Sequence, residues 1–296
     1  MIIKGLSRIG VFFLYLLSLL PFWFLYLLSD VLYFVIYYLT GYRKKVVREN
    51  LRNSFPEKTD AERSAIERRF YSYLCDLMLE TIKMLTISRK QLLKRMMPVQ
   101  NGIDADIEAI IANGRPIIGA VGHYGNWEMA ALRFSMLYPD VARVIVYKPL
   151  TNPVFDKLFK NMRERLGATL VAMKDILRKL VSLRNQQTFT LLVSDQTPIQ
   201  ESAQYFTQFL NQPTAIFMGV EKLAKSTDAV VVFCDIRCVK RGYYTFSFSL
   251  IEDQPKNAEP HAITNKHVAY LENMIKLAPQ YWLWSHRRWK FKPKAI

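Results

Sequence analysis

The chain begins with a long apolar run and only later adopts the alternation typical of a globular domain. No charged residue occurs between Ile9 and Ser29, and apolar positions in this run fall on every face of a helix. A helix of this length can cross a hydrocarbon core of about 30 Å. Pro21 interrupts the run, and a second, shorter apolar stretch covers 31–39. The pattern predicts a membrane anchor over 1–42, either as one spanning helix or as a tilted, partly embedded hairpin.

Two other interpretations of the anchor fit the pattern less well. A buried core helix can also be apolar on all sides, but a run of this length that includes Trp23 and Tyr26 favours membrane contact. A signal peptide has a shorter apolar region and a small-residue cleavage site, which does not follow here. Basic residues are more numerous after the run than before it, where Lys4 and Arg8 stand. The positive-inside rule therefore predicts that the rest of the chain lies in the cytoplasm.

Beyond the anchor the periodicity changes twice. Apolar residues recur at helical spacing over 43–97, and a helix-start pattern lies within this range at 59–62. From Arg115 onward, short β-branched runs alternate with amphipathic stretches. These predict strands over 116–121, 143–147, 168–171, 188–193, 229–238 and 243–250, and helices over 126–137, 153–166, 174–184 and 214–225. The alternation predicts an α/β fold with a mostly parallel central sheet flanked by helices, preceded by a helical lead-in.

The composition narrows the class of partner. Of 296 residues, 51% are hydrophobic, which excludes intrinsic disorder. Lysine and arginine outnumber the acidic residues by 41 to 25, a net charge of +16 that indicates an anionic partner: a phosphate-bearing substrate, a nucleic acid or an acidic membrane face. The membrane anchor makes nucleic acid the least favoured of these. The three cysteines form no disulfide framework, which indicates a reducing compartment.

The segment 281–294 interleaves aromatic and cationic residues, with Trp282, Trp284 and Trp289 among the arginines and lysines. This mixture is typical of a lipid-headgroup interface. It also suits single-stranded nucleic acid, or a packed core whose charges face water. The sequence pattern leaves all three open.

Candidate chemistry follows the first predicted strand, where ligands bind in a parallel sheet. The sequence there is Gly122-His123-Tyr124-Gly125-Asn126-Trp127-Glu128. Bulky rings stand where a dinucleotide loop needs small groups, and the chain carries no Walker loop, G-x-S-x-G elbow or H-E-x-x-H motif. No third ligand is spaced near His123, so no metal site is predicted.

His123 and Glu128 are five positions apart, about 140° around a continuous helix, so their side chains can meet only across a strand-to-helix turn. Gly122 and Gly125 permit such a turn. A carboxylate bonded to one imidazole nitrogen would strengthen the other as a base. The alternative is a surface pair without catalytic function, which spacing alone favours.

Five blocks in order resemble the lipid A late acyltransferases of Gram-negative bacteria, within the glycerolipid acyltransferase superfamily that shares an H-x4-D/E motif. The blocks are His123 to Glu128, Val146 to Pro153, Arg163 to Ala168, Ser194 to Pro198 and Tyr281 to Lys290. Lys148 departs from the arginine more usual there, and the phrase 206–213 replaces a more glycine-rich one.

The resemblance implies transfer of a fatty acyl group from a thioester, on acyl-carrier protein or coenzyme A, to a hydroxyl of an anionic lipid A precursor, with no cofactor. It implies an acyltransferase domain over 43–296, composed of the lead-in 43–114 and the core 115–296, on the cytoplasmic face of the bacterial inner membrane. Another glycolipid, an aminolipid or a lysophospholipid is an alternative acceptor, and a non-catalytic lipid-binding protein is the alternative of another class. The resemblance implies His123 and Glu128 as catalytic residues and Lys148, Arg163, Arg165, Asp195, Gln196 and Asn126 as substrate-binding residues.

Overall fold

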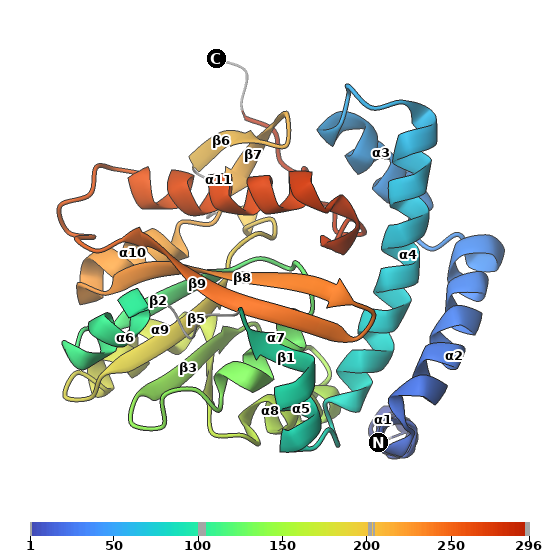
Figure 1. Cartoon of the computed structure of the whole chain (residues 1–296), viewed down its shortest axis with the longest axis horizontal. Helices are drawn as coiled ribbons and strands as arrows, with labels where there is room; N and C mark the ends of the chain where they lie inside the picture. The colour runs from blue at the N-terminus through green and yellow to red at the C-terminus, as the bar shows by residue number, and fades with distance from the viewer. Residues whose placement is uncertain (1, 100–104, 201–202, 204, 294–296) are drawn as a thin grey trace.

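A computed structural model describes residues 2–99, 105–200, 203 and 205–293. Its centre is a seven-stranded sheet in the order β1-β9-β8-β2-β5-β3-β4 (Figure 1). The strands are β1 (Met96–Pro98), β2 (Ile117–Val121), β3 (Ala142–Tyr147), β4 (Thr169–Ala172), β5 (Thr188–Val193), β8 (Val230–Lys240) and β9 (Tyr243–Glu252). Only the β8–β9 pair is antiparallel within this sheet, which confirms the mostly parallel α/β prediction.

Helices cover both faces of the sheet because its strands are apolar on both sides. In β2, Ile118 and Ala120 face one apolar core, which contains residues of α9 (Ile176–Ser182), α10 (Gly219–Thr227) and α11 (Ala262–Leu277). Ile117 and Val121 face the other core, which contains residues of α6 (Ala105–Ala112), α7 (Trp127–Phe134) and α8 (Pro153–Glu164). The alternation along one strand thus divides the core in two.

The prediction of a helix over 214–225 is wrong at its start. The chain first forms a two-stranded antiparallel sheet of β6 (Tyr205–Phe209) and β7 (Gln212–Ile216), and α10 begins only at Gly219. The connection is the two-residue turn Leu210-Asn211, whose φ angles are 51° and 62°. Positive φ at both positions is the geometry of the tightest hairpins, and no glycine marks it in the sequence.

The predicted anchor is not one continuous helix. It forms α1 (Ile2–Leu19), a break at Leu20 and Pro21, and α2 (Phe22–Phe34), which continues as the π-helical η1 (Val35–Thr40). Proline cannot donate the backbone bond that a continuous helix needs here. The segment Phe22–Thr40 is long and apolar enough to cross a membrane.

The helical lead-in places a long helix between the anchor and the sheet (Figure 1). It consists of α3 (Lys44–Ser54), α4 (Asp60–Lys83) and α5 (Arg89–Arg95). The predicted start of α4 is confirmed: Thr59 and Glu62 form a reciprocal capping box. α4 packs against α1 and α2 on one side and against α7, which follows His123, on the other.

Candidate active site

The loop between β2 and α7 carries His123 and is held tightly. Gly125 has φ +58°, and a Cβ there would lie 2.8 Å from Ile236 Cγ2. Its N–H donates to the Tyr281 carbonyl at 3.0 Å. A Cβ on Gly122 would lie 2.6 Å from Leu271 Cδ1. Gly125 therefore supplies the left-handed turn, whereas Gly122 permits close packing on α11.

The carboxylate that contacts His123 is Asp195, at the end of β5. His123 Nδ1 lies 2.6 Å from Asp195 Oδ1, and the His123 backbone N–H donates to Oδ2 at 2.9 Å. The register of the sheet explains the contact: Val121 pairs with Val193 in parallel strands, so the residues two positions further on lie side by side. Trp282 Nε1 also donates to Oδ2, at 2.8 Å.

These contacts fix the charge of Asp195. Burial of the carboxyl favours its neutral form, but the His123 ring and the hydrogen bonds outweigh burial and lower the pKa of Asp195 to about 2. An ionised Asp195 accepts, so His123 Nδ1 carries the proton and Nε2 presents its lone pair. Gln196 Nε2 lies 3.2 Å from this Nε2, and the Trp127 ring packs edge-on at 5.0 Å.

The expected bond between His123 and Glu128 is not formed, and this prediction requires correction. Glu128, in the first turn of α7, instead pairs with Arg163 of α8: Nε donates to Oε2 at 2.8 Å and Nη2 to Oε1. Burial lowers the pKa of the Arg163 guanidinium, but nearby acidic groups, Glu128 foremost, together raise it above its usual value. Both nitrogens of the guanidinium edge are used on Glu128, so this edge is not free for a phosphate.

Asn126 has a supporting role in the structure. Its Oδ1 accepts from the Met129 N–H at 2.8 Å and so caps α7, and its Nδ2 donates to Glu80 Oε2 at 2.6 Å. Glu80 of α4 also accepts from the hydroxyls of Tyr26 and Tyr244, each at 2.8 Å. Asn126 is fully buried, so its side chain holds the loop rather than facing a substrate.

The remaining predicted binding residues are spread over different places. Lys148 is exposed after β3. Arg165 donates to the carbonyls of Met84 and Ile87, at 3.1 and 2.6 Å, and so fastens α8 to the turn before α5. Gln196 is exposed beside His123. The structure thus brings together His123, Asp195 and Gln196, while Glu128 and Arg163 form a separate pair.

The aromatic C-terminal segment is largely core. Trp282 and Trp284 are 2% and 0% exposed, which removes them from the headgroup interface that the sequence also allowed. Trp282 steadies Asp195, and His286 Nε2 accepts from the Thr197 N–H at 3.2 Å. Burial lowers the pKa of His286 to about 4, which keeps it an acceptor at neutral pH. Trp282 and Glu80 support the site although neither was singled out for that role from the sequence.

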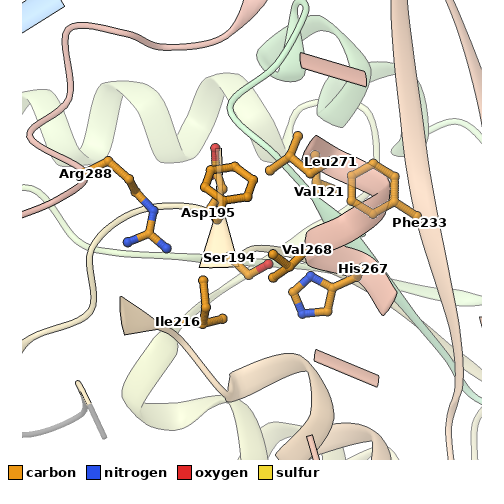
Figure 2. A pocket seen from close by; sticks show the side chains of 10 residues that line it. Val121, Ser194, Asp195, Ile216, Phe233, His267, Val268, Leu271 and Arg288 are labelled. Carbon is orange, nitrogen blue, oxygen red and sulfur yellow. The ribbon is translucent and has the colours of Figure 1, made fainter. Parts of the chain in front are cut away.

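A small pocket of about 10 Å³ has Asp195 in its wall (Figure 2). Its wall is mainly apolar, with Phe233 and Leu271 among its residues, but it includes the buried side chains of His267 and Arg288. Within the described part of the chain, His267 Nε2 and Arg288 Nε and Nη1 have no hydrogen-bond partner. Burial lowers the pKa of Arg288 to about 10.

The family model for bacterial lipid A biosynthesis acyltransferases matches residues 1–291. The chain belongs to this family. It is 25% identical over 296 residues to the lipid A biosynthesis lauroyltransferase of Escherichia coli K12, covering 98% of this chain and 93% of that protein. It is 24% identical over 282 residues to a lipid A biosynthesis acyltransferase of Haemophilus influenzae, covering 93% and 85%.

Membership confirms the resemblance carried by the five sequence blocks, and it makes the chain an acyltransferase of the lipid A biosynthesis family. Acyl transfer to a hydroxyl requires a base that takes the proton of that hydroxyl. Near the ends of β2 and β5, the His123 side chain is oriented by Asp195 and is 19% exposed.

Proposed function

We propose that the chain transfers a fatty acyl group from an acyl-carrier-protein thioester to a hydroxyl of a lipid A precursor, at the cytoplasmic face of the inner membrane. The contact of 2.6 Å between His123 Nδ1 and Asp195 Oδ1 is the observation that carries the proposal. It leaves Nε2 as the nitrogen available to act as a base, on a side chain that is 19% exposed. The family supplies the reaction class and the lipid.

In the proposed step, His123 Nε2 takes the proton of the acceptor hydroxyl as the oxygen attacks the thioester carbonyl carbon. The C–O bond forms, the C–S bond breaks, and the departing thiolate takes the proton back from the imidazolium. The products are the lipid ester and the free thiol of the carrier. No acyl-enzyme is needed, because the acceptor itself is the nucleophile.

Asp195 acts here as the orienting carboxylate. It accepts the Nδ1 proton and balances the imidazolium that forms during transfer. Its low pKa keeps it ionised throughout the working pH range. Glu128 does not contact the ring, so we assign to it and Arg163 the positioning of α7, whose first residue, Trp127, packs on His123.

The donor and the acceptor carry charges that suit this chain. Acyl-carrier protein and lipid A phosphates are both anionic, and the net charge of the chain is +16. Gln196 beside Nε2 and the exposed Lys148 after β3 are the polar side chains that we expect to meet the substrates. Arg165 is used on backbone carbonyls, so we expect no substrate contact from it.

The test uses the full chain purified in detergent, with acyl-carrier-protein thioester and an under-acylated lipid A, and reads the product by mass spectrometry. His123→Ala should lower turnover by at least about 10³-fold, since it removes the base and its geometry. His261→Ala, which removes a histidine stacked on Tyr205, is the matched control and should keep turnover. Wild-type turnover in His123→Ala would refute the mechanism.

The same assay separates the possible acceptors. Replacing lipid A by a lysophospholipid should remove most product if the lipid A precursor is the acceptor. Acylation of the lysophospholipid at an equal rate would reject the acceptor while leaving the His123 mechanism in place. Replacing the carrier-protein thioester by acyl-coenzyme A tests the donor in the same way.

A further inference from the structure

The segment Phe22–Thr40 presents one apolar face to the outside. Trp23, Leu27, Val31, Phe34 and Tyr38 are each more than half exposed. At 100° per residue, the four of these positions that lie in α2 fall within about 80° of one another around the helix axis. The opposite side carries Leu25 and Ser29, which are 1% exposed.

The helix before it repeats this arrangement. In α1, Leu6, Ile9, Phe12, Phe13 and Leu19 are more than half exposed, whereas Ser7 and Ser18 on the other side are buried. Figure 1 views α1 close to end-on while α2 runs across the same edge of the molecule. Both helices thus carry exposed apolar side chains at this edge of the molecule. An apolar surface of this extent marks an interaction site.

Polar contacts fasten this segment to α4 along its length. Tyr26 donates to Glu80 at 2.8 Å, and Ser29 donates to Asp76 at 2.7 Å. Near the other end, the rings of Tyr37 and Tyr71 lie 5.3 Å apart. α4 also carries exposed arginines. A bilayer core does not accept such a helix, so α2 cannot cross the bilayer while it stays docked on α4.

Charged and polar groups hold the middle of the anchor as well. Asp30, near the centre of Phe22–Thr40, pairs with Arg241 of the β8–β9 turn at 2.6 Å. Lys83 of α4 donates to the carbonyls of Ser18 and Leu20 at the end of α1, each at 2.8 Å. In a spanning helix, Asp30 would lie at the bilayer midplane. In this structure its charge is paired with that of Arg241 in the globular domain.

We propose that α1 and the α2–η1 segment do not cross the membrane but lie in the plane of one anionic leaflet, with their exposed apolar faces among the acyl chains. The cations at the ends of the helices fit this placement. Arg8, Arg43 and Lys45 are exposed, where they reach anionic headgroups. Trp23 and Tyr38 suit the boundary between headgroups and chains. The proposal concerns membrane attachment and does not depend on the acyl-transfer mechanism.

The first test is labelling with a membrane-impermeant maleimide, in spheroplasts and in inside-out vesicles. Cysteine is introduced singly as Gly5→Cys, Pro21→Cys or Lys45→Cys, which probe the beginning of α1, the break and the end of η1. No site should label from the outside of spheroplasts, and Gly5→Cys and Lys45→Cys should both label in inside-out vesicles. The unsubstituted chain, whose Cys75 and Cys234 are buried and Cys238 partly so, gives the background.

Two outcomes would overturn the placement. Labelling of Gly5→Cys in spheroplasts would mean that a helix crosses the bilayer once. Labelling of Pro21→Cys in spheroplasts would mean that the two helices cross as a hairpin.

The second test measures binding of the purified chain to phosphatidylcholine vesicles with and without phosphatidylglycerol. The triple variant Trp23→Ser/Leu27→Ser/Val31→Ser should bind at least about tenfold more weakly. The matched control Leu177→Ser/Val181→Ser alters exposed apolar side chains of α9 and should bind as the wild type does. Unchanged binding of the triple variant would reject the surface. Acyl transfer in detergent should persist in every variant, so loss of the proposed function would be recognised separately.

Discussion

Two buried carboxylates hold the two ends of the His123 loop, and they differ in charge. Asp195 fixes the beginning of the loop and Glu80 fixes its end through Asn126. Each is less than 10% exposed, and each accepts three hydrogen bonds. Yet the pKa of Asp195 is lowered to about 2, whereas that of Glu80 is raised to about 7.

The difference lies in the donors. Burial raises the pKa of both groups. The donors to Glu80 are two phenols and an amide, which are neutral, and their bonds do not outweigh burial. Asp195 faces an imidazole that gains a positive charge, and this attraction adds to its hydrogen bonds. Equal numbers of hydrogen bonds therefore give one permanent anion next to the base and one group that titrates near neutrality.

Removing the anion should have the largest effect. Asp195→Asn should lower kcat by about 10³- to 10⁴-fold, because the ring loses the partner that fixes its tautomer and balances its charge. Single-turnover rates and a near-UV spectrum of the variant are the measurements. A native spectrum with kcat within tenfold of wild type would show that Asp195 does not orient the base.

The turn at Gly125 lies between the two ends of the loop that Asp195 and Glu80 hold. It should be the next most sensitive position. Gly125→Ala should destabilise the fold by about 3 kcal/mol, since a Cβ meets Ile236 at 2.8 Å and φ is +58°. Thermal or denaturant unfolding in detergent measures the change. Gly114→Ala is the matched control: φ is +69° but nothing lies within 4 Å, so the loss should be only about 1 kcal/mol. Equal losses would show that the loop tolerates a side chain.

The third carboxylate near the loop, Glu128, differs from the other two because it pairs with a guanidinium, that of Arg163. Glu128→Gln or Arg163→Gln alone should cost about 2 kcal/mol, because each leaves a partly buried charge unpaired. The double variant should lose less than the sum of the two. A double-mutant cycle on unfolding free energies measures the coupling. Strict additivity would mean that the pair is not formed in solution.

The smallest effect should be a pH dependence from Glu80. Because its folded-state pKa is raised from 4.5 to about 7, its contribution to stability is present below about pH 4.5 and is lost as pH rises through 7. Glu80→Gln, which stays neutral, should therefore gain Tm relative to wild type between pH 5 and 8. A difference in Tm that does not change over this range would contradict the raised pKa. Turnover of this variant at pH 6 should stay within about tenfold of wild type.

The sequence predicted those parts of the fold that local periodicity encodes. The strand 188–193 and the beginning of α8 at Pro153 were placed correctly, because β-branched runs and a proline at a helix start are local signals. The hairpin of β6 and β7 was missed because its turn residues, Leu210 and Asn211, include no glycine. The break at Pro21 was visible in the sequence, but the sequence did not show on which surface the two resulting helices pack.

The site was found in part. The motif and its position after a strand pointed to His123, and Asp195 was singled out at another strand end. Their contact depends on the register between β2 and β5, strands about 70 residues apart, which no local pattern contains. The family resemblance implied Glu128 instead, and spacing only allowed this pair to meet across the turn. The contacts of Trp282 with Asp195 and of Glu80 with Asn126 also join residues far apart in the sequence.

The indole of Trp282 on Asp195 also sets an order of events during biosynthesis. The ribosome releases α1 and α2 long before it adds Trp282, so we expect the apolar faces of these helices to meet lipid while the base still lacks its full support. Under the proposed mechanism and membrane placement, the base would gain its full support only after these helices have met the bilayer.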